Sequence, residues 1–270
     1  MFAEMGLQKL ELRRGTDVRR AVFAVIDDTS LLPFSAAPEL MLSAAELAQY
    51  AHLHFVQKRQ AFMLGRLAAK IALGAMLEES AWPNISIRAG VFGQPQVTHP
   101  RALGIDVTVS HSNGMAVAVV FPADWPVGID LETVASDALA TVLAALDVSP
   151  EERAWLAAEP MRLPPGVEPS ERGVRPAGWE ALASCGLLWT AREALGKALK
   201  TGLNSPLGVL SLCDFKPTDA DSSANSWTGG YANFPQFRWL AQAFGARILT
   251  LCRPREIELV APPNLFLPVR

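Results

Sequence analysis

The 270-residue chain has only three cysteines, and no two of them form a CxxC pair. Cys185, Cys213 and Cys252 are odd in number and widely spaced, which argues against a disulfide framework and against a zinc site built on cysteine pairs. This pattern fits a reducing compartment. We therefore expect a cytoplasmic protein.

The chain also has little excess of either charge, because 19% of the residues are charged and the net charge is -3. The chain thus lacks a global basic field that would attract nucleic acid or an anionic membrane. Near the N-terminus no apolar run is longer than residues 21–26, and charged residues precede it. We expect no signal peptide, no membrane and no nucleic-acid partner, so any anion-binding site must be local.

Half of the residues are hydrophobic, which is enough to bury the core of one large domain or two smaller ones. Ser43 and Glu46 have the spacing of a capping box, so a helix is expected to begin there, and residues 56–77 predict a second, long helix. Ser112 to Gly114 indicate a hairpin turn. Strands are expected at residues 21–26, 85–88, 106–109, 115–121 and 128–132.

The second half of the chain repeats this layout. After a helical stretch to about residue 146, Ser149 and Pro150 indicate another helix start, and residues 187–200 predict a helix followed by strands. Residues 161–178 are rich in proline and glycine and predict a loop or insertion. The strands after the last helix are expected at residues 209–213, 237–240, 247–251 and 257–260.

The recurrence of a long helix followed by strands, with Gly65-Arg66 echoed by Gly196-Lys197, suggests an internal repeat. We therefore predict an α+β fold of two similar α/β subdomains, residues 1–125 and 126–270. We expect these subdomains in a pseudo-two-fold arrangement, with the active site in the cleft between them.

An acidic strand is expected at residues 128–132. With alternating side chains, Ile129 and Leu131 would point into a core while Asp130 and Glu132 share the opposite face. Two neighbouring carboxylates repel each other unless a cation lies between them or one takes a proton, and Mg²⁺ favours such pairs. The alternative is an exposed edge strand whose acidic residues face water.

Two helices carry charged residues at helical spacing. Glu193 and Lys197 are four residues apart, a spacing that is also typical of an ordinary surface ion pair. Arg59, Arg66 and Lys70 follow at intervals of seven and four, so they lie along one face. That face is either solvated or suited to phosphate groups, to which arginine offers a fixed fork of donors.

Ser110, His111 and Ser112 place three hydrogen-bonding side chains at the end of one expected strand, which suits an anion. A lone histidine at such a position is more often a structural residue.

Together, Ser110-His111-Ser112, the Gly128 to Glu132 strand and the Trp189 to Lys197 helix resemble the Sfp-type 4′-phosphopantetheinyl transferases in order and spacing. Gly93-Gln94-Pro95 and Lys58-Arg59 extend the resemblance, which covers roughly residues 45 to 212.

The resemblance implies transfer of phosphopantetheine from coenzyme A to a serine of an apo acyl, peptidyl or aryl carrier protein, releasing adenosine 3′,5′-bisphosphate. It implies a monomer that serves pathways such as secondary metabolite biosynthesis. Asp130, Glu132 and Glu193 would hold Mg²⁺, with Mn²⁺ as a substitute, on the pyrophosphate. Glu193 would also be the base for the serine, and Lys197 would balance charge as the bond breaks. The expected substrate-binding residues are Arg59, Arg66, Gln94, Pro95, Ser110 and His111, with Arg59, Ser110 and His111 at the 3′-phosphate.

Three features depart from the family pattern. Arg192 replaces a lysine before Glu193, Gln94 replaces the lysine of Gly-Lys-Pro, and the proline-rich segment at 161–178 is longer than usual. Two other functions stay open, one supported by Gln94 and the insertion and the other by the acidic residues alone. One is a non-catalytic coenzyme A-binding regulatory module, and the other is a Mg²⁺-dependent pyrophosphate hydrolase.

Overall fold

A computed structural model describes residues 6–134, 147–158, 179–218 and 226–260, and the chain forms two compact units. Unit 1 ends at Val127 and takes the chain up again at Glu256, whereas unit 2 is Gly128–Arg255. The expected boundary after residue 125 lies two residues from the observed one. The segment from Glu256 onward had been expected in the second subdomain, but it groups with unit 1 because its strand pairs with the N-terminal strand.

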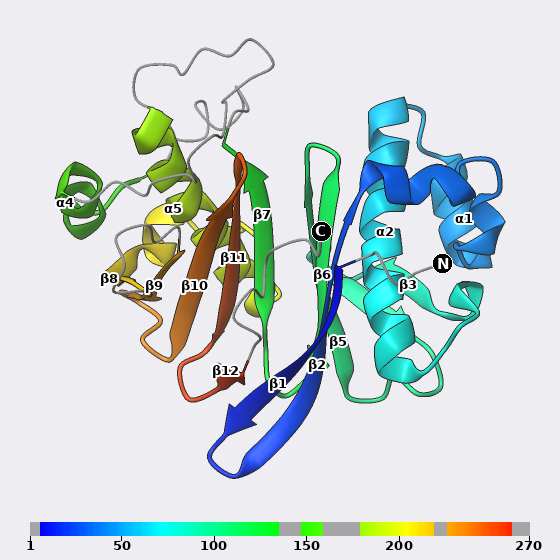
Figure 1. The fold of residues 1–270 in the computed structure, drawn as a ribbon, viewed down its shortest axis with the longest axis horizontal. Coiled ribbons are helices and arrows are strands. Elements are labelled where there is room, and N and C mark those ends of the chain that lie inside the picture. Colours follow the sequence, from blue (N-terminus) through cyan, green and yellow to red (C-terminus); the bar gives the residue numbers. More distant parts are fainter. Residues whose placement is uncertain (1–5, 135–146, 159–178, 219–225, 261–270) are drawn as a thin grey trace. The chain divides into compact units, whose positions relative to one another are not determined.

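Unit 1 is built on a five-stranded antiparallel sheet in the order β12-β1-β2-β6-β5 (Figure 1). The long helix α2 packs on β2, β5 and β6, and α1 packs on the small β3-β4 hairpin. The elements are β1 (Gly6–Arg14), β2 (Asp17–Asp27), α1 (Ala44–Ala51), α2 (Val56–Leu77), β3 (Ser86–Ala89), β4 (Pro95–Thr98), β5 (Ile105–Ser112), β6 (Met115–Pro122) and β12 (Glu258–Val260).

Helix α2 forms the centre of the unit 1 core. Ala68, Ala69 and Ala72 are fully buried, and their small side chains let the helix approach the sheet closely. Within the described ranges, α2 is the helix whose length and composition would suffice to cross a membrane, but 72% of its most apolar window is buried inside the protein. Its apolar character is therefore accounted for by the core.

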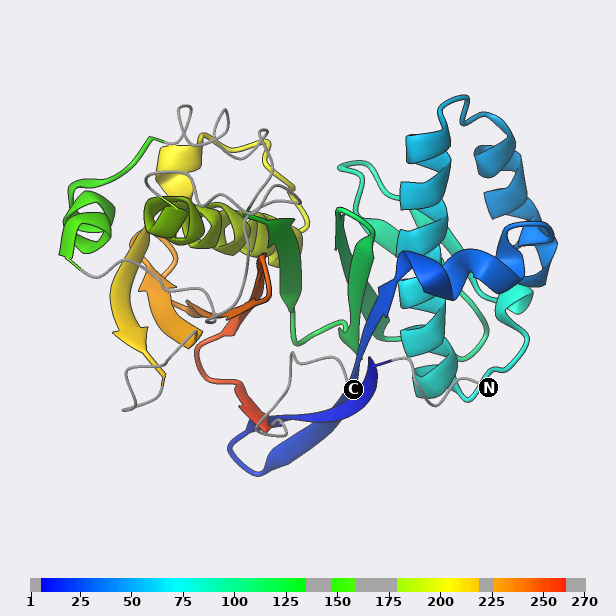
Figure 2. The same cartoon turned by 45° about the horizontal axis from the view of Figure 1, so that its top comes forward.

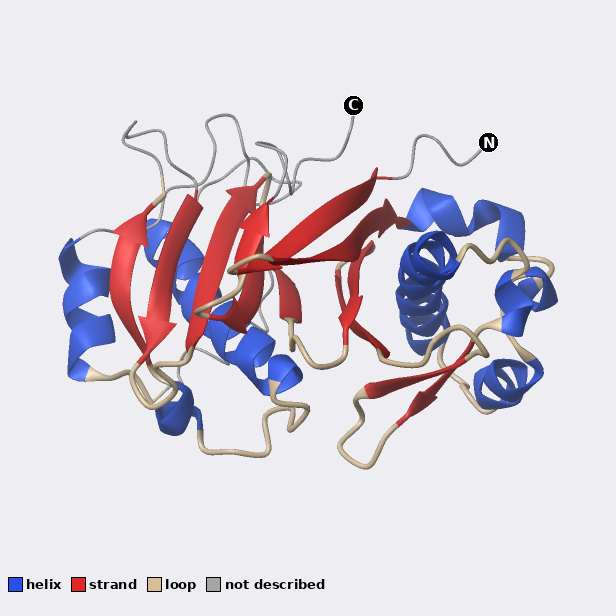
Figure 3. Ribbon diagram, turned by 90° about the horizontal axis from the view of Figure 1, so that it is seen from below, coloured by secondary structure: helices blue, strands red, loops and turns tan. Residues whose placement is uncertain are grey.

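Unit 2 is built on a second five-stranded antiparallel sheet, in the order β7-β11-β10-β9-β8. Helix α5 covers one face of this sheet, and α4 lies beside β8 (Figure 3). The elements are β7 (Gly128–Thr133), α4 (Pro150–Ala158), α5 (Trp179–Ala198), β8 (Leu212–Pro217), β9 (Ser226–Tyr231), β10 (Phe237–Phe244) and β11 (Arg247–Pro254).

The two units share one connectivity. Among the described helices and strands of each, a strand is followed by a short helix, a long helix and four further strands, and the order β2-β6-β5, with β4 and β3 beyond, corresponds to β7-β11-β10-β9-β8. The α+β fold with two similar subdomains is thus as predicted. The pseudo-two-fold arrangement and the cleft stay predictions.

The correspondence extends to a buried ion pair in each unit. Ser43 and Glu46 form the expected capping box of α1, and the same Glu46 carboxylate lies 2.7 Å from Lys70 Nζ of α2 and accepts from Ile87 N of β3 at 3.2 Å. Glu46 and Lys70 are both fully buried. One carboxylate therefore joins three elements.

In unit 2, Ser149 and Glu152 cap α4 in the same way. Nη2 of Arg192 on α5 donates to both carboxylate oxygens of Glu152 at 2.7 and 2.8 Å, and Leu212 N of β8 donates to Glu152 Oε1 at 2.8 Å. By contact, therefore, Lys70 corresponds to Arg192. The repeat seen in the packing therefore aligns Lys70 with Arg192. It does not align Gly65-Arg66 with Gly196-Lys197, as the sequence suggested.

Most expected elements are confirmed, with a few differences. Helix α2 covers the expected residues, and the turn between β5 and β6 has positive φ at Asn113 (43°) and Gly114 (77°), which fits a two-residue hairpin. Helix α5 begins at Trp179, eight residues before the expected start, and Leu207–Leu210 form a 3-10 turn (η4) where a strand was expected. Strands β1, β4 and β9 were not predicted. The helical stretch to residue 146 and the insertion at 161–178 lie outside the described residues.

Candidate active site

The acidic strand β7 and the helix α5 are in unusually close contact (Figure 2). A Cβ atom at Gly128 would lie 1.8 Å from Ala194 O and 2.7 Å from Ala198 N, so a side chain at this position would displace the helix backbone. Glycine at residue 128 therefore lets α5 lie directly on the strand that carries Asp130 and Glu132.

This contact brings Lys197 to Asp130. Lys197 Nζ lies 2.6 Å from Asp130 Oδ1, and only 3% of Asp130 is exposed. Ile129 and Leu131 are fully buried, as the alternation predicted. The face that carries Asp130 is covered by α5, so the alternative of an exposed acidic edge is wrong for Asp130.

Glu193 lies in the same electrostatic environment. Burial raises its pKa to about 7, and the negative charges of Asp130 and Glu132 add to this, while the Lys197 ammonium lowers it. The structure thus groups Asp130, Glu132, Glu193 and Lys197, four of the residues that the sequence singled out.

The three carboxylates suit a divalent cation by their chemistry. They are hard oxygen donors, and their mutual repulsion, visible in the pKa of Glu193, is what a cation such as Mg²⁺ would relieve. In the described part of the chain, no three His, Cys, Asp or Glu side chains stand close enough together to hold a metal ion. Assignment of Asp130, Glu132 and Glu193 as metal ligands stays a prediction.

Arg192, the neighbour of Glu193, has a structural partner. It is fully buried and pairs with Glu152 through Nη2 alone, while its Nε and Nη1 atoms have no hydrogen-bond partner among the described residues. Because Nη2 alone contacts the Glu152 carboxylate, this pair does not require the two-pronged donor geometry of a guanidinium. The replacement of the usual lysine is therefore compatible with this pair.

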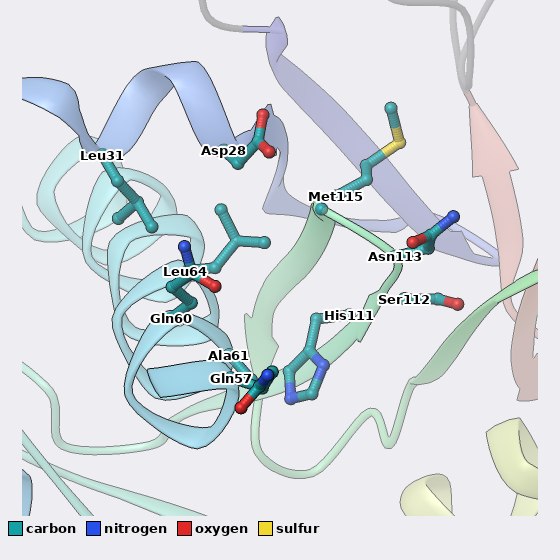
Figure 4. A pocket seen from close by; sticks show the side chains of 11 residues that line it. Asp28, Leu31, Gln57, Gln60, Ala61, Leu64, His111, Ser112, Asn113 and Met115 are labelled. Atoms are coloured by element: carbon teal, nitrogen blue, oxygen red, sulfur yellow. The ribbon is translucent and has the colours of Figure 1, made fainter. Parts of the chain in front are cut away.

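In unit 1, His111 and Ser112 line a pocket of about 430 Å³ (Figure 4). His111 is exposed at the end of β5, and its Cδ2 atom would be 3.5 Å from a Cβ atom at Gly65 of α2. Asp28 at the start of a 3-10 helix (η1, Asp28–Phe34), Gln57 and Gln60 also line the pocket. Its described lining includes no lysine or arginine.

The basic residues of α2 point to other partners. Arg66 Nε lies 3.2 Å from Glu46 Oε1, and burial lowers the pKa of Arg66 while Glu46 partly offsets the shift. Lys70 is the buried partner of the same carboxylate. Arg59 Nε donates to Leu53 O at 2.5 Å, and its guanidinium lies 5.2 Å from the Tyr50 ring centroid. Glu46 thus takes up two of the three charges of the predicted basic stripe.

Gln94 and Pro95 close the turn before β4. Gln94 Oε1 accepts from Phe92 N at 2.9 Å, and the carboxamide lies over Gly90, where a Cβ atom would meet it at 2.5 Å. The Gln94 side chain therefore stabilises its own turn. Its role toward a phosphate stays a prediction, as do those of Arg59, Arg66, Pro95, Ser110 and His111.

Three buried residues next to the acidic group were not predicted as site residues. Thr190 of α5 and Thr250 of β11 lie with their hydroxyl oxygens 2.6 Å apart, and Glu152 holds Arg192. The capping-box spacing of Ser149 and Glu152 is a local signal that could have identified Glu152. The threonine pair is separated by 60 residues and leaves no local signal.

Residues 126–252 match a family model described as the 4′-phosphopantetheinyl transferase superfamily. The matched segment contains Asp130, Glu132, Glu193 and Lys197. The Sfp-type within that superfamily stays a prediction. A search of curated proteins gives no match.

Solved structures with some likeness are holo-acyl-carrier-protein synthases. One from Bacillus anthracis str. Ames, in complex with CoA (3′,5′-ADP), is 20% identical with a TM-score of 0.33, covering 43% of this chain and 95% of that one. One from Plasmodium yoelii is 16% identical with a TM-score of 0.33, covering 43% and 94%. One from Helicobacter pylori, in complex with coenzyme A, is 18% identical with a TM-score of 0.31, covering 38% and 98%.

Proposed function

We propose, from the match of residues 126–252 to the 4′-phosphopantetheinyl transferase superfamily, that the chain transfers 4′-phosphopantetheine from coenzyme A to a serine hydroxyl of an apo carrier protein. Adenosine 3′,5′-bisphosphate is the other product. The observation that carries the proposal is the group formed by Asp130, Glu193 and Lys197 inside the matched segment. We propose an acyl, peptidyl or aryl carrier protein as the acceptor.

The chemistry of this group suits phosphoryl transfer, which depends on positioning and charge neutralisation more than on covalent catalysis. Asp130, Glu132 and Glu193 would hold Mg²⁺ or Mn²⁺, which supplies positive charge to the pyrophosphate when bound. Lys197 supplies a further positive charge to the departing phosphate. Glu193 accepts the serine proton as a general base.

The substrate-binding part of the proposal concerns unit 1. We assign the 3′-phosphate end of coenzyme A to Ser110, His111 and Arg59. His111 supports this because it is exposed beside a pocket. We propose Arg66, Gln94 and Pro95 as further substrate-binding residues. We also propose a cytoplasmic monomer that serves secondary metabolite biosynthesis.

The test is mass spectrometry of a panel of apo carrier proteins incubated with coenzyme A and Mg²⁺. The wild type should add the mass of one phosphopantetheinyl group to at least one carrier, EDTA should stop the reaction, and Mg²⁺ or Mn²⁺ should restore it. Asp130→Ala and Glu193→Gln should lower the rate by about 10²-fold or more. Glu39→Gln, an exposed carboxylate in unit 1, is the matched control and should leave the rate unchanged.

The other functions give different results in the same assay. Binding of coenzyme A without modification of any carrier would favour the regulatory module. Release of adenosine bisphosphate without a carrier would favour the hydrolase. Near-normal turnover by Asp130→Ala would refute the assignment of the acidic group.

A further inference from the structure

Helix α5 is tied to the unit 2 sheet by a buried pair of threonines. Thr190 and Thr250 are both fully buried, and their hydroxyl oxygens lie 2.6 Å apart. Thr190 Oγ1 also donates to Leu187 O at 3.2 Å. A chain in which Thr250 donates to Thr190 and Thr190 donates to Leu187 uses each hydroxyl hydrogen once.

This pair lies next to the acidic group. Thr250 is the cross-strand partner of Asp130 in the pairing of β11 with β7. On α5, Thr190 precedes Glu193 by three residues and Lys197 by seven, so all three project from the same side of the helix. The hydrogen bond thus joins the helix to the sheet one turn before Glu193 and two turns before Lys197, which contacts Asp130.

The apolar contacts of α5 do not by themselves specify its register. The helix buries small or apolar side chains such as Ala191, Ala194 and Ala198 against the sheet, and hydrophobic contacts are not directional. Hydrogen bonds require defined distances and angles. Tyr231 Oη of β9 donates to Ala191 O at 2.8 Å, which anchors the helix toward the far strands. The threonine pair anchors it beside β7.

We propose that Thr190 and Thr250 are positioning residues, which fix the register of α5 on β11 so that Lys197 and Glu193 stand opposite Asp130 and Glu132. The consequence for catalysis rests on the proposed function. The consequence for Lys197 does not, because its contact with Asp130 is a property of the folded protein.

The experiment compares Thr190→Val, Thr250→Val, the double valine variant and Thr190→Ser with the wild type. Valine keeps the shape of threonine and removes the hydroxyl, whereas serine keeps the hydroxyl. Thr228→Val is the matched control, because Thr228 Oγ1 of β9 donates to Trp239 O at 2.7 Å in the same sheet. All variants are assayed well below their melting temperatures.

The first readout is the acetylation rate of Lys197 under native conditions, followed by mass spectrometry, with the exposed Lys200 as internal reference. Losing a net hydrogen bond of about 1 kcal/mol should raise the population in which Lys197 is released roughly fivefold. Each single valine variant should show this increase, and Thr190→Ser and Thr228→Val should not.

The second readout is kcat for transfer to a carrier. A small displacement of catalytic groups costs up to about 100-fold, so kcat of the single valine variants should fall by about tenfold or more. The double valine variant separates positioning from stability. Replacing both partners by apolar groups can restore stability, but it cannot restore a directional contact. We expect its melting temperature to recover and its kcat to stay low.

The proposal is overturned if Lys197 stays as protected in both single valine variants as in Thr228→Val, or if Thr190→Ser behaves like Thr190→Val. Recovery of both melting temperature and kcat in the double variant would also overturn it, since the pair would then contribute only stability. Absence of any transfer by the wild type would refute the proposed function instead, and the Lys197 acetylation rates would still decide the role of the threonines.

Discussion

Asp130 lies in a nearly buried position, and the Lys197 ammonium lies 2.6 Å from its Oδ1. Removing one partner of such a pair leaves a buried charge without compensation, which costs more than the pair contributes. This asymmetry makes Lys197 important for stability as well as for the proposed chemistry.

We predict that Lys197→Met lowers the free energy of unfolding by about 1–3 kcal/mol in the absence of metal and lowers the transfer rate by about 10²-fold. Urea denaturation and steady-state kinetics measure the two effects. Lys200→Met, which removes an exposed charge three residues away, is the control and should change neither. Unchanged stability of Lys197→Met would show that its contact with Asp130 is energetically neutral.

Cys252 has the most perturbed thiol of the three cysteines. It is fully buried, and burial raises its pKa to about 12, although hydrogen bonding to Tyr231 and the charge of Arg253 act in the opposite direction. At pH 8.5 only about one thiol in a thousand or fewer would be ionised. The reactive species is the thiolate, so Cys252 should be inert in the folded protein.

We predict that iodoacetamide at pH 8.5 modifies the partly exposed Cys213 well before Cys252, although burial also raises the pKa of Cys213. In urea all three cysteines should react. Peptide mass spectrometry over time measures the rates. Equal native rates at Cys213 and Cys252 would contradict the burial of β11.

At the scale of elements, the pairing of β7 with α5 depends on one glycine. The atoms that a Cβ at Gly128 would meet belong to the backbone of α5, so no side-chain rotation can relieve the clash. The helix must shift, and it carries Glu193 and Lys197 with it.

We predict that Gly128→Ala destabilises the protein by about 1–3 kcal/mol, as overpacking does, and that it lowers kcat by about tenfold or more through displacement of α5. Gly230→Ala is the control, because a Cβ there meets Cys213 Sγ at 3.4 Å, an ordinary contact. Thermal unfolding and kinetics of both variants decide the matter. A fully active Gly128→Ala would mean that α5 need not lie so close to β7.

At the scale of the whole molecule, a buried ion pair between a short helix and a long helix recurs in both compact units. In each, the capping glutamate of a short helix pairs with a buried basic side chain of the long helix and accepts a hydrogen bond from a strand N–H. The pairs are Glu46 with Lys70 in one unit and Glu152 with Arg192 in the other. The partners come from different elements, so each pair stabilises its own unit.

We predict that Glu46→Gln and Glu152→Gln each destabilise one unit by about 3 kcal/mol or more, because a buried cation loses its partner. Hydrogen exchange with mass spectrometry should show faster exchange of α2 and β3 in Glu46→Gln, and of α5 and β8 in Glu152→Gln. Each variant serves as the control for the other. Equal loss of protection in both units by either change would show that the chain unfolds as one cooperative body.

The elements that rest on local rules could be predicted from the amino-acid sequence alone. The capping box at Ser43, the full length of α2, the hairpin turn at Asn113 and the inward Ile129 and Leu131 all follow from spacing and turn chemistry within a few residues. The order and spacing of the motifs also indicated the 4′-phosphopantetheinyl transferase superfamily, whose family model matches residues 126–252.

Which charged side chains meet depends on contacts between elements that are distant in the sequence. Lys197 stands four residues after Glu193, yet its 2.6 Å contact is with Asp130, 67 residues away. Arg66 and Lys70 fit a phosphate-binding stripe by spacing, yet they pair with Glu46. Helical spacing specifies which side chains share a face, but the partner of that face comes from another element. The low dielectric of the interior then makes pairing with that partner decisive.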